Sequence, residues 1–193
     1  MKLRGLYAIT PESADLIDKV RRALDGGIAL LQYRRKRHDV REARQVIALA
    51  RAYKVPVIVN DSVDLALELD ADGAHLGRDD GGLDAARRRL AGRMLGASCY
   101  DDPVLAQRAV AAGVDYIAFG SVFASPTKPG AVRAPLSLFR QGLSVPLCAI
   151  GGITLQNAPQ LIDAGADLLA VISDLFDAPD ISARAAQYRK LFA

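Results

Sequence analysis

Short apolar runs alternate along the whole chain with longer segments whose apolar residues recur at helical spacing. Eight of the runs are brief, rich in aliphatic residues and closed by polar or glycine-containing stretches, the pattern that predicts strands. They cover residues 6–9, 29–33, 56–60, 73–76, 94–98, 116–120, 147–150 and 168–172. Amphipathic segments predicted as helices lie between them, among them 14–24, 40–52, 104–112 and 157–164.

This repeated alternation predicts parallel strands joined by helical crossovers. The predicted strands are almost continuously apolar, as expected where both faces of a sheet are covered. A glycine-containing turn recurs where a helix ends and a strand begins, at 25–27, 72–73, 112–115 and 164–167. Eight units without a Gly-x-Gly-x-x-Gly opening favour a closed barrel over a doubly wound open sheet. We therefore predict an α/β fold, a single (β/α)8 TIM-barrel domain over residues 1–193.

Composition narrows the functional classes. The net charge is +3, and the basic residues are scattered apart from short runs at 34–37 and 87–89, so we expect no nucleic-acid partner. No run approaches transmembrane length and the N-terminal apolar stretch is too short for a signal peptide, so we expect no membrane association and a cytoplasmic location. Cys99 and Cys148 lie in apolar runs and are predicted to be buried, reduced thiols.

In such a barrel the active site is built from the carboxyl ends of the strands. The second predicted strand ends in Gln32-Tyr33-Arg34-Arg35-Lys36, and the two-residue period would direct Gln32, Arg34 and Lys36 to the same side. An amide with two cations suits a diphosphate. A solvated basic loop is the alternative.

Asp61 and Asp80 follow the third and fourth predicted strands. Two carboxylates from adjacent strand ends suit Mg²⁺, which takes one or two carboxylates together with substrate phosphates and water. Helix N-capping is the alternative for each residue, but the neighbouring basic strand end favours the metal. Ser98 could bind phosphate or serve a turn, and His75 is expected to pack or hydrogen-bond near the barrel mouth.

Two later segments are candidates for phosphate binding. Residues 121–134 lack regular periodicity, and within them Ser125, Thr127 and Lys128 offer two hydroxyls and a charge. The last two strand ends carry Gly151-Gly152 and Ser173, at the position where barrels often bind phosphate through backbone N–H groups.

Taken in order, these motifs resemble those of the thiamine-phosphate synthase family over about residues 6–173. The motifs are Gln32-x-Arg34-x-Lys36, Asn60-Asp61, 75–80, Gly96-Ala97-Ser98, 120–128, 150–153 and Ile172-Ser173. No single motif is specific, but the ordered set is.

The resemblance implies a transferase. It would condense 4-amino-2-methyl-5-(diphosphooxymethyl)pyrimidine with 4-methyl-5-(2-phosphoethyl)thiazole, or the carboxylated thiazole phosphate, to give thiamine phosphate and diphosphate. Diphosphate would leave first, and the thiazole nitrogen would capture the resulting pyrimidine methyl cation.

The resemblance also implies a role for each matching residue. Catalysis would use Arg34, Lys36 and Lys128, and Mg²⁺ would bind Asp61 and Asp80. The pyrimidine diphosphate would bind Gln32, Tyr33, Arg34, Arg35, Lys36, Asn60, Ser98 and Lys128. The thiazole phosphate would bind Ser125, Pro126, Thr127, Gly152, Ile172 and Ser173.

Departures from the family pattern occur at Ser62, Arg78, Ser121 and Ser125. Ser125 keeps a hydroxyl, whereas Arg78 beside a metal-binding carboxylate could weaken metal affinity or contact a phosphate. Three alternatives to a synthase remain open at this point. A thiazole tautomerase of the same fold would need a histidine where Cys99-Tyr100 stands. A phosphate-ligand sensor would not need both aspartates, and a phosphosugar isomerase would leave the basic strand end unexplained. A homo-oligomer is also left open.

Overall fold

The computed structural model describes residues 3–37, 39–124 and 133–193. Eight parallel strands close into a barrel in sequence order, β1 to β8, with β8 paired to β1. The strands are β1 Gly5–Ile9, β2 Leu30–Tyr33, β3 Val57–Asn60, β4 Gly73–Leu76, β5 Met94–Tyr100, β6 Tyr116–Gly120, β7 Leu147–Ile150 and β8 Leu168–Val171. The predicted (β/α)8 barrel is therefore confirmed, and each strand lies within two residues of its predicted bounds.

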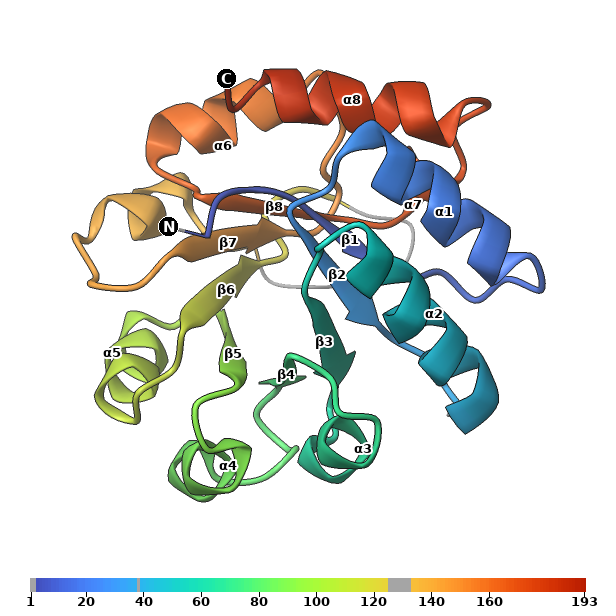
Figure 1. The fold of residues 1–193 in the computed structure, drawn as a ribbon. Coiled ribbons are helices and arrows are strands. Elements are labelled where there is room, and N and C mark those ends of the chain that lie inside the picture. Colours follow the sequence, from blue (N-terminus) through green and yellow to red (C-terminus); the bar gives the residue numbers. More distant parts are fainter. Residues whose placement is uncertain (1–2, 38, 125–132) are drawn as a thin grey trace.

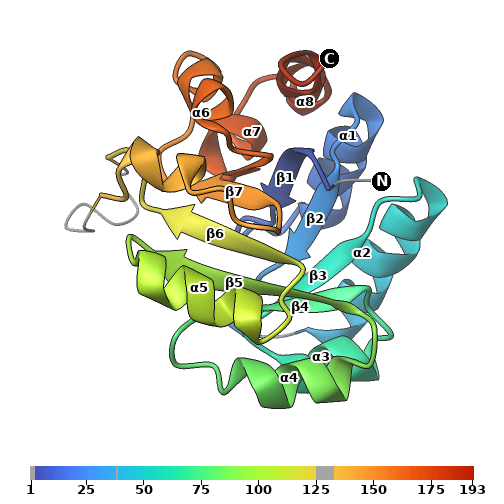
Figure 2. The ribbon, with the colours of Figure 1, turned by 90° about the vertical axis from the view of Figure 1, so that its left-hand side faces the viewer.

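Helices surround the ring of strands (Figures 1 and 2). They are α1 Leu16–Gly26, α2 Val40–Ala52, α3 Val63–Glu68, α4 Leu83–Leu90, α5 Pro103–Ala111, α6 Ala158–Ala164, α7 Ser173–Phe176 and α8 Ile181–Lys190. Between β6 and β7 the described residues contain one 3₁₀ helix, Leu136–Arg140. The last helix, α8, packs against α1 and so closes the outer layer of the barrel (Figure 1). Among the described residues, no helix combines the length and apolar character needed to cross a bilayer.

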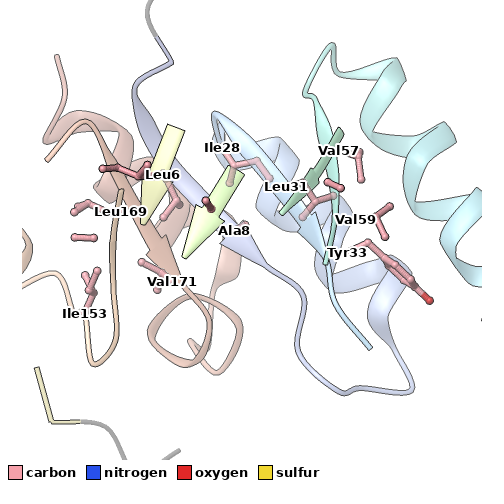
Figure 3. Close-up of a cluster of buried hydrophobic side chains, with 14 of the residues drawn as sticks. Leu6, Ala8, Ile28, Leu31, Tyr33, Val57, Val59, Ile153, Leu169 and Val171 are labelled. Carbon is pink, nitrogen blue, oxygen red and sulfur yellow. The ribbon is translucent and has the colours of Figure 1, made fainter. Parts of the chain in front are cut away.

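Apolar side chains form two layers because successive strand residues point to opposite faces. The outer layer lies between strands and helices and includes Leu31, Val57, Val59 and Leu169 (Figure 3). The inner layer fills the barrel with residues such as Leu30, Ile58, Tyr116, Cys148 and Leu168. Both cysteines are buried and free, as predicted.

The recurring helix-to-strand turn has two structural roles. Gly27, Gly113 and Gly165 adopt positive φ, which glycine accepts without a Cβ penalty. Gly73 does not have positive φ and instead opens β4, so the left-handed prediction is wrong there; Asp70 takes that conformation before it. The aspartates before β4, β6 and β8 cap the preceding strand: Asp72, Asp115 and Asp167 accept 2.7–3.1 Å hydrogen bonds from Val57, Leu95 and Leu147 N–H.

Candidate active site

A pocket of about 870 Å³ opens at the carboxyl ends of the barrel strands. Nine of the predicted site residues line it: Gln32, Arg34, Asn60, Asp61, Asp80, Ser98, Gly152, Ile172 and Ser173. They come from strand ends and the segments that follow them, far apart in sequence, and only the closure of the barrel brings them together. Ser125, Pro126, Thr127 and Lys128 lie outside the described residues.

Tyr33 does not face this pocket. Its side chain lies in the outer apolar layer beside Leu31 and Val59 (Figure 3), and its hydroxyl donates to the Asp39 carbonyl at 3.1 Å. The reason is the two-residue period of β2, which sends Gln32 inward and Tyr33 outward. The prediction that Tyr33 contacts the substrate is therefore wrong in this structure.

Arg35 is turned away from the pocket as well and holds two loops together. Its guanidinium forms a bidentate pair with Glu42 at the start of α2. It also donates to the carbonyls of Pro11 at 3.2 Å and Ser13 at 2.7 Å, both in the loop after β1. Glu12 completes the cluster at 3.4 Å. Arg35 is thus a structural contact, and its predicted role in substrate binding is corrected.

Lys36 lies in a shallow groove beside the pocket, together with Glu12 and Glu42. The Glu12 carboxylate accepts a 2.7 Å hydrogen bond from the Lys36 backbone N–H. The sequence predicted one common direction for Gln32, Arg34 and Lys36. Gln32 and Arg34 do line the pocket, but Lys36 does not. The physical reason is that β2 ends at Tyr33, so the strand period does not extend to Lys36.

Arg34 brings positive charge to the pocket. Its backbone is fixed by Thr10, whose hydroxyl accepts from the Arg34 N–H at 2.8 Å and lies 2.9 Å from the Arg34 carbonyl. The Arg34 side chain is exposed and makes no ion pair with any residue that the structure describes. It is therefore available to an anionic ligand.

Asp61 and Asp80 stand together at the strand ends of β3 and β4. Burial, followed by the neighbouring Asp80 carboxylate, raises the pKa of Asp61 to about 6, against the opposing effect of Arg34. The Asp80 carboxylate accepts from Gly77 N–H at 2.6 Å. Neither residue is an N-cap, because Ser62 caps α3 and Gly82 precedes α4. The capping alternative is thus excluded for both carboxylates.

Arg78, the departure noted beside this pair, does not line the pocket. Its guanidinium stacks on the Tyr100 ring at 4.9 Å from the centroid. The Arg78 backbone N–H donates to the Tyr100 hydroxyl at 3.2 Å. Tyr100 itself lines the pocket, where a tautomerase of this fold would need its histidine. Arg78 therefore packs against a pocket residue without lining the pocket itself.

The pocket floor is a chain of polar side chains inside the barrel. His75 Nε2 lies 2.9 Å from Ser98 Oγ, and His75 Nδ1 lies 3.0 Å from the Tyr116 hydroxyl. Tyr116 contacts the Tyr7 hydroxyl at 2.8 Å, and Gln32 donates to Tyr7 at 2.8 Å. Burial lowers the pKa of His75 to about 4, so its ring is neutral at physiological pH. His75 hydrogen-bonds near the barrel mouth, as predicted.

The opposite side of the pocket carries the predicted phosphate-binding segments. Gly151 and Gly152 have φ of 106° and 64°, and a Cβ on Gly152 would overlap the Ala124 carbonyl. Asn157 holds this loop by donating to the Gly152 carbonyl at 2.9 Å. Ser173, at the start of α7, lines the same pocket. Glycine is required at these two positions because φ is positive and because the chain around Ser121 and Ala124 packs directly against them.

Several pocket residues were not among the sequence predictions. Tyr7 comes from β1, and Asp174 and Arg184 reach the rim from α7 and α8. Arg184 pairs with Asp174 at 2.7 Å. The signal for Tyr7 was present in the strand period, since Tyr7 pairs with the inward-facing Leu30, two residues before Gln32 in β2. Arg184 carried no local signal, because α8 follows the last strand and its approach to the pocket depends on barrel closure.

Proteins of one family resemble this chain over almost its whole length. The family model described as thiamine monophosphate synthase matches residues 6–175. A protein of Aromatoleum aromaticum named thiamine-phosphate synthase is 61% identical over 202 aligned positions, covering 99% of this chain and 97% of that protein. A protein of the same name from an Azoarcus species is 55% identical, covering 100% and 98%.

Solved structures give the same picture. Thiamine phosphate pyrophosphorylase from Pyrococcus furiosus superposes with a TM-score of 0.87 at 34% identity, covering 98% of this chain and 96% of that one. A 3-hexulose-6-phosphate synthase has a TM-score of 0.77 at 17% identity, with 98% and 100% covered, and shows the shared barrel fold alone. With the family model and close relatives matching almost the whole sequence, the chain belongs to the thiamine monophosphate synthase family.

Proposed function

We propose that this enzyme condenses 4-amino-2-methyl-5-(diphosphooxymethyl)pyrimidine with 4-methyl-5-(2-phosphoethyl)thiazole, or its carboxylated form, to give thiamine phosphate and diphosphate. The observation that carries the proposal is the composition of the pocket. An exposed arginine, Arg34, and two clustered carboxylates lie at one end of it, and glycine backbone with Ser173 at another. A substrate with a diphosphate and a second with a phosphate match these two ends.

Mg²⁺ fits the carboxylate pair. Burial and Asp80 raise the pKa of Asp61, which means that the two negative charges repel each other and that a cation between them would relieve the repulsion. Asp61 and Asp80 would supply the one or two carboxylates that Mg²⁺ takes, and substrate oxygens and water would supply the rest. Bound there, Mg²⁺ would neutralise negative charge on the departing diphosphate.

The residues of the chain provide the remaining electrostatic stabilisation. Arg34 can offer two N–H groups to phosphate oxygens in a planar fork. Lys36 would have to swing in from its groove, and Lys128 is assigned by the family resemblance. Removing one preorganised charge contact of this kind costs roughly 10²–10³ in rate.

The proposed reaction needs no histidine as a general base, and His75 is not free to act as one. His75 is the one histidine lining it among the described residues, and both of its ring nitrogens are engaged by Ser98 and Tyr116. Its pKa of about 4 makes it a poor proton acceptor at neutral pH. This disfavours the tautomerase alternative, which requires proton transfer.

Product formation tests the proposal. Wild type is incubated with both substrates in Mg²⁺ and in EDTA, in parallel with Asp61→Ala and Asp80→Ala. Asp64→Ala is the matched control, because Asp64 is close in sequence, exposed and paired with Arg89 on the surface. We expect wild type and the control to form thiamine phosphate with Mg²⁺ and not with EDTA. In the two pocket variants we expect the rate of product formation to fall by about 10²-fold or more. No product from folded wild type that still binds thiazole phosphate would refute the synthase and favour a tautomerase or a sensor.

A further inference from the structure

Four hydrogen bonds run without a break beneath the pocket. In order, they join Gln32, Tyr7, Tyr116, His75 and Ser98, at distances of 2.8, 2.8, 3.0 and 2.9 Å. The members come from five strands, and Tyr7 and Tyr116 are completely buried. The two ends of the chain, Gln32 and Ser98, both line the pocket.

Proton counting gives this chain a single direction. The Gln32 amide nitrogen can only donate, so Tyr7 accepts from it. Among the described residues, Tyr116 is the one acceptor recorded for the Tyr7 hydroxyl proton, so Tyr7 donates to Tyr116. Tyr116 accepts from Tyr7, and His75 Nδ1 is the one acceptor recorded among the described residues for the Tyr116 proton, so Tyr116 donates to His75. A neutral imidazole that accepts at Nδ1 carries its proton on Nε2, so His75 donates to Ser98. The Ser98 hydroxyl proton is then left for a ligand.

At the Gln32 end, the chain of hydrogen bonds presents an acceptor to the pocket instead of a donor. Among the residues that the structure describes, no partner is recorded for Gln32 Oε1, yet no buried side-chain oxygen or nitrogen is left unpaired. The Gln32 side chain lines the pocket, where this carbonyl oxygen can accept. One end of the chain presents an acceptor and the other a donor.

We propose that Tyr7, Tyr116 and His75 are positioning residues that lock Gln32 as an acceptor and Ser98 as a donor toward one ligand ring. A nitrogen heterocycle with an amino group beside a ring nitrogen offers the complementary donor and acceptor. The assignment of that ring to the pyrimidine substrate rests on the proposed function, but the polarity of the chain does not. A single reversed amide at Gln32 would invert all four bonds and present the wrong pattern.

The protonation of His75 reports the polarity directly. Nitrogen-15 NMR distinguishes the protonated from the bare ring nitrogen, and with two histidines in the chain the His75 signal is assigned by its loss in His75→Gln. In ligand-free wild type at neutral pH we expect the proton on Nε2. A proton on Nδ1 would overturn the proposal.

Gln32→Glu should reverse the direction of the hydrogen bonds, a change that a merely structural role of these residues would not produce. An ionised carboxylate only accepts, so Tyr7 must donate to it and Tyr116 to Tyr7. His75 must then donate from Nδ1. We expect its proton to move from Nε2 to Nδ1 once the carbon-13 shift of the new carboxyl shows it ionised. Gln32→Glu with Tyr116→Phe breaks the chain and should abolish this response; a response that persists, or no response in the single variant, would contradict the relay.

Kinetics tests the consequence for the ligand. Tyr116→Phe keeps the ring and removes one hydroxyl, so we expect KM for the pyrimidine diphosphate to rise about tenfold with KM for the thiazole phosphate unchanged. Tyr53→Phe is the control, because that hydroxyl bonds Asp25 on the surface. Equal changes in both KM values would overturn the ring-specific role. If the chain made no thiamine phosphate, the proposed function would fail while the His75 tautomer would still decide the relay.

Discussion

Arg35 is expected to matter for stability more than for catalysis. Arg35→Ala removes a guanidinium whose side chain is 10% exposed and leaves Glu42, 20% exposed, without its cationic partner. It also removes the hydrogen bonds to Pro11 and Ser13 that join the loops after β1 and β2. Breaking one side of a buried ion pair costs 3–5 kcal/mol, and the partial access of solvent to Glu42 places the expected loss at about 3 kcal/mol.

Equilibrium unfolding in urea measures this loss as a lower midpoint. For a chain of this length, about 3 kcal/mol corresponds to a fall in Tm of roughly 6–12 °C. Arg44→Ala is the matched control, since Arg44 and Glu68 lie 3.9 Å apart with both side chains more than half exposed. That pair should change the free energy of unfolding by less than about 0.5 kcal/mol.

Activity at a temperature where every variant is folded separates a structural contact from a substrate contact. Arg34→Ala should lower the rate by roughly 10²–10³ because Arg34 lines the pocket. Its free energy of unfolding should stay within about 0.5 kcal/mol of wild type, as is usual for an exposed side chain. Arg35→Ala should show the reverse, with less than a tenfold loss of rate. An Arg35→Ala protein as stable as wild type but a hundredfold slower would refute the reasoning and restore the substrate contact that the sequence predicted.

Two further predictions concern the pocket floor. Gly96→Ala would place a Cβ 2.5 Å from His75 Nδ1 and in overlap with the buried Tyr116 ring, so it should destabilise the fold by about 3 kcal/mol or more; unfolding at the wild-type midpoint would contradict this. Because burial lowers the folded-state pKa of His75 from 6.5 to about 4, the unfolded state binds more protons between these values. The stability conferred by neutral His75 is therefore complete above pH 6.5 and decreases by about 3 kcal/mol as the pH falls toward 4. The raised pKa of Asp61 has the opposite sign, so the measurement is the difference in urea unfolding between wild type and His75→Gln across this window; parallel curves would show that His75 does not titrate as expected.

Much of the fold could be predicted from the chain because its signals are local. The strands and the helices at 40–52 and 104–112 appear as periodic apolar patterns within short windows. The N-cap at Asp102, followed by Pro103, is equally local. The turn at Gly73 shows the limit, since glycine there serves a close approach to the Met94 backbone in the next strand.

The candidate site was predictable where motif order and strand period agree. Gln32 and Ser98 lie near the carboxyl ends of their strands, and Asp61 and Asp80 lie in the segments that follow β3 and β4. All four line the pocket together. Tyr33 received its substrate role from the family resemblance, although the strand period already directed its side chain outward, where its hydroxyl bonds the Asp39 carbonyl.

By itself, then, the sequence determined the barrel, the family and the strand ends that carry chemistry, because these depend on residue type and spacing along the chain. Only the tertiary structure decided which charges face the ligand. Arg34 and Arg35 are adjacent and chemically identical, yet one lines the pocket and the other pairs with Glu42. The relay beneath the pocket likewise exists only after closure, because its Tyr7–Tyr116 bond joins residues 109 positions apart. Such contacts depend on the direction of each side chain in space, which spacing along the chain does not encode.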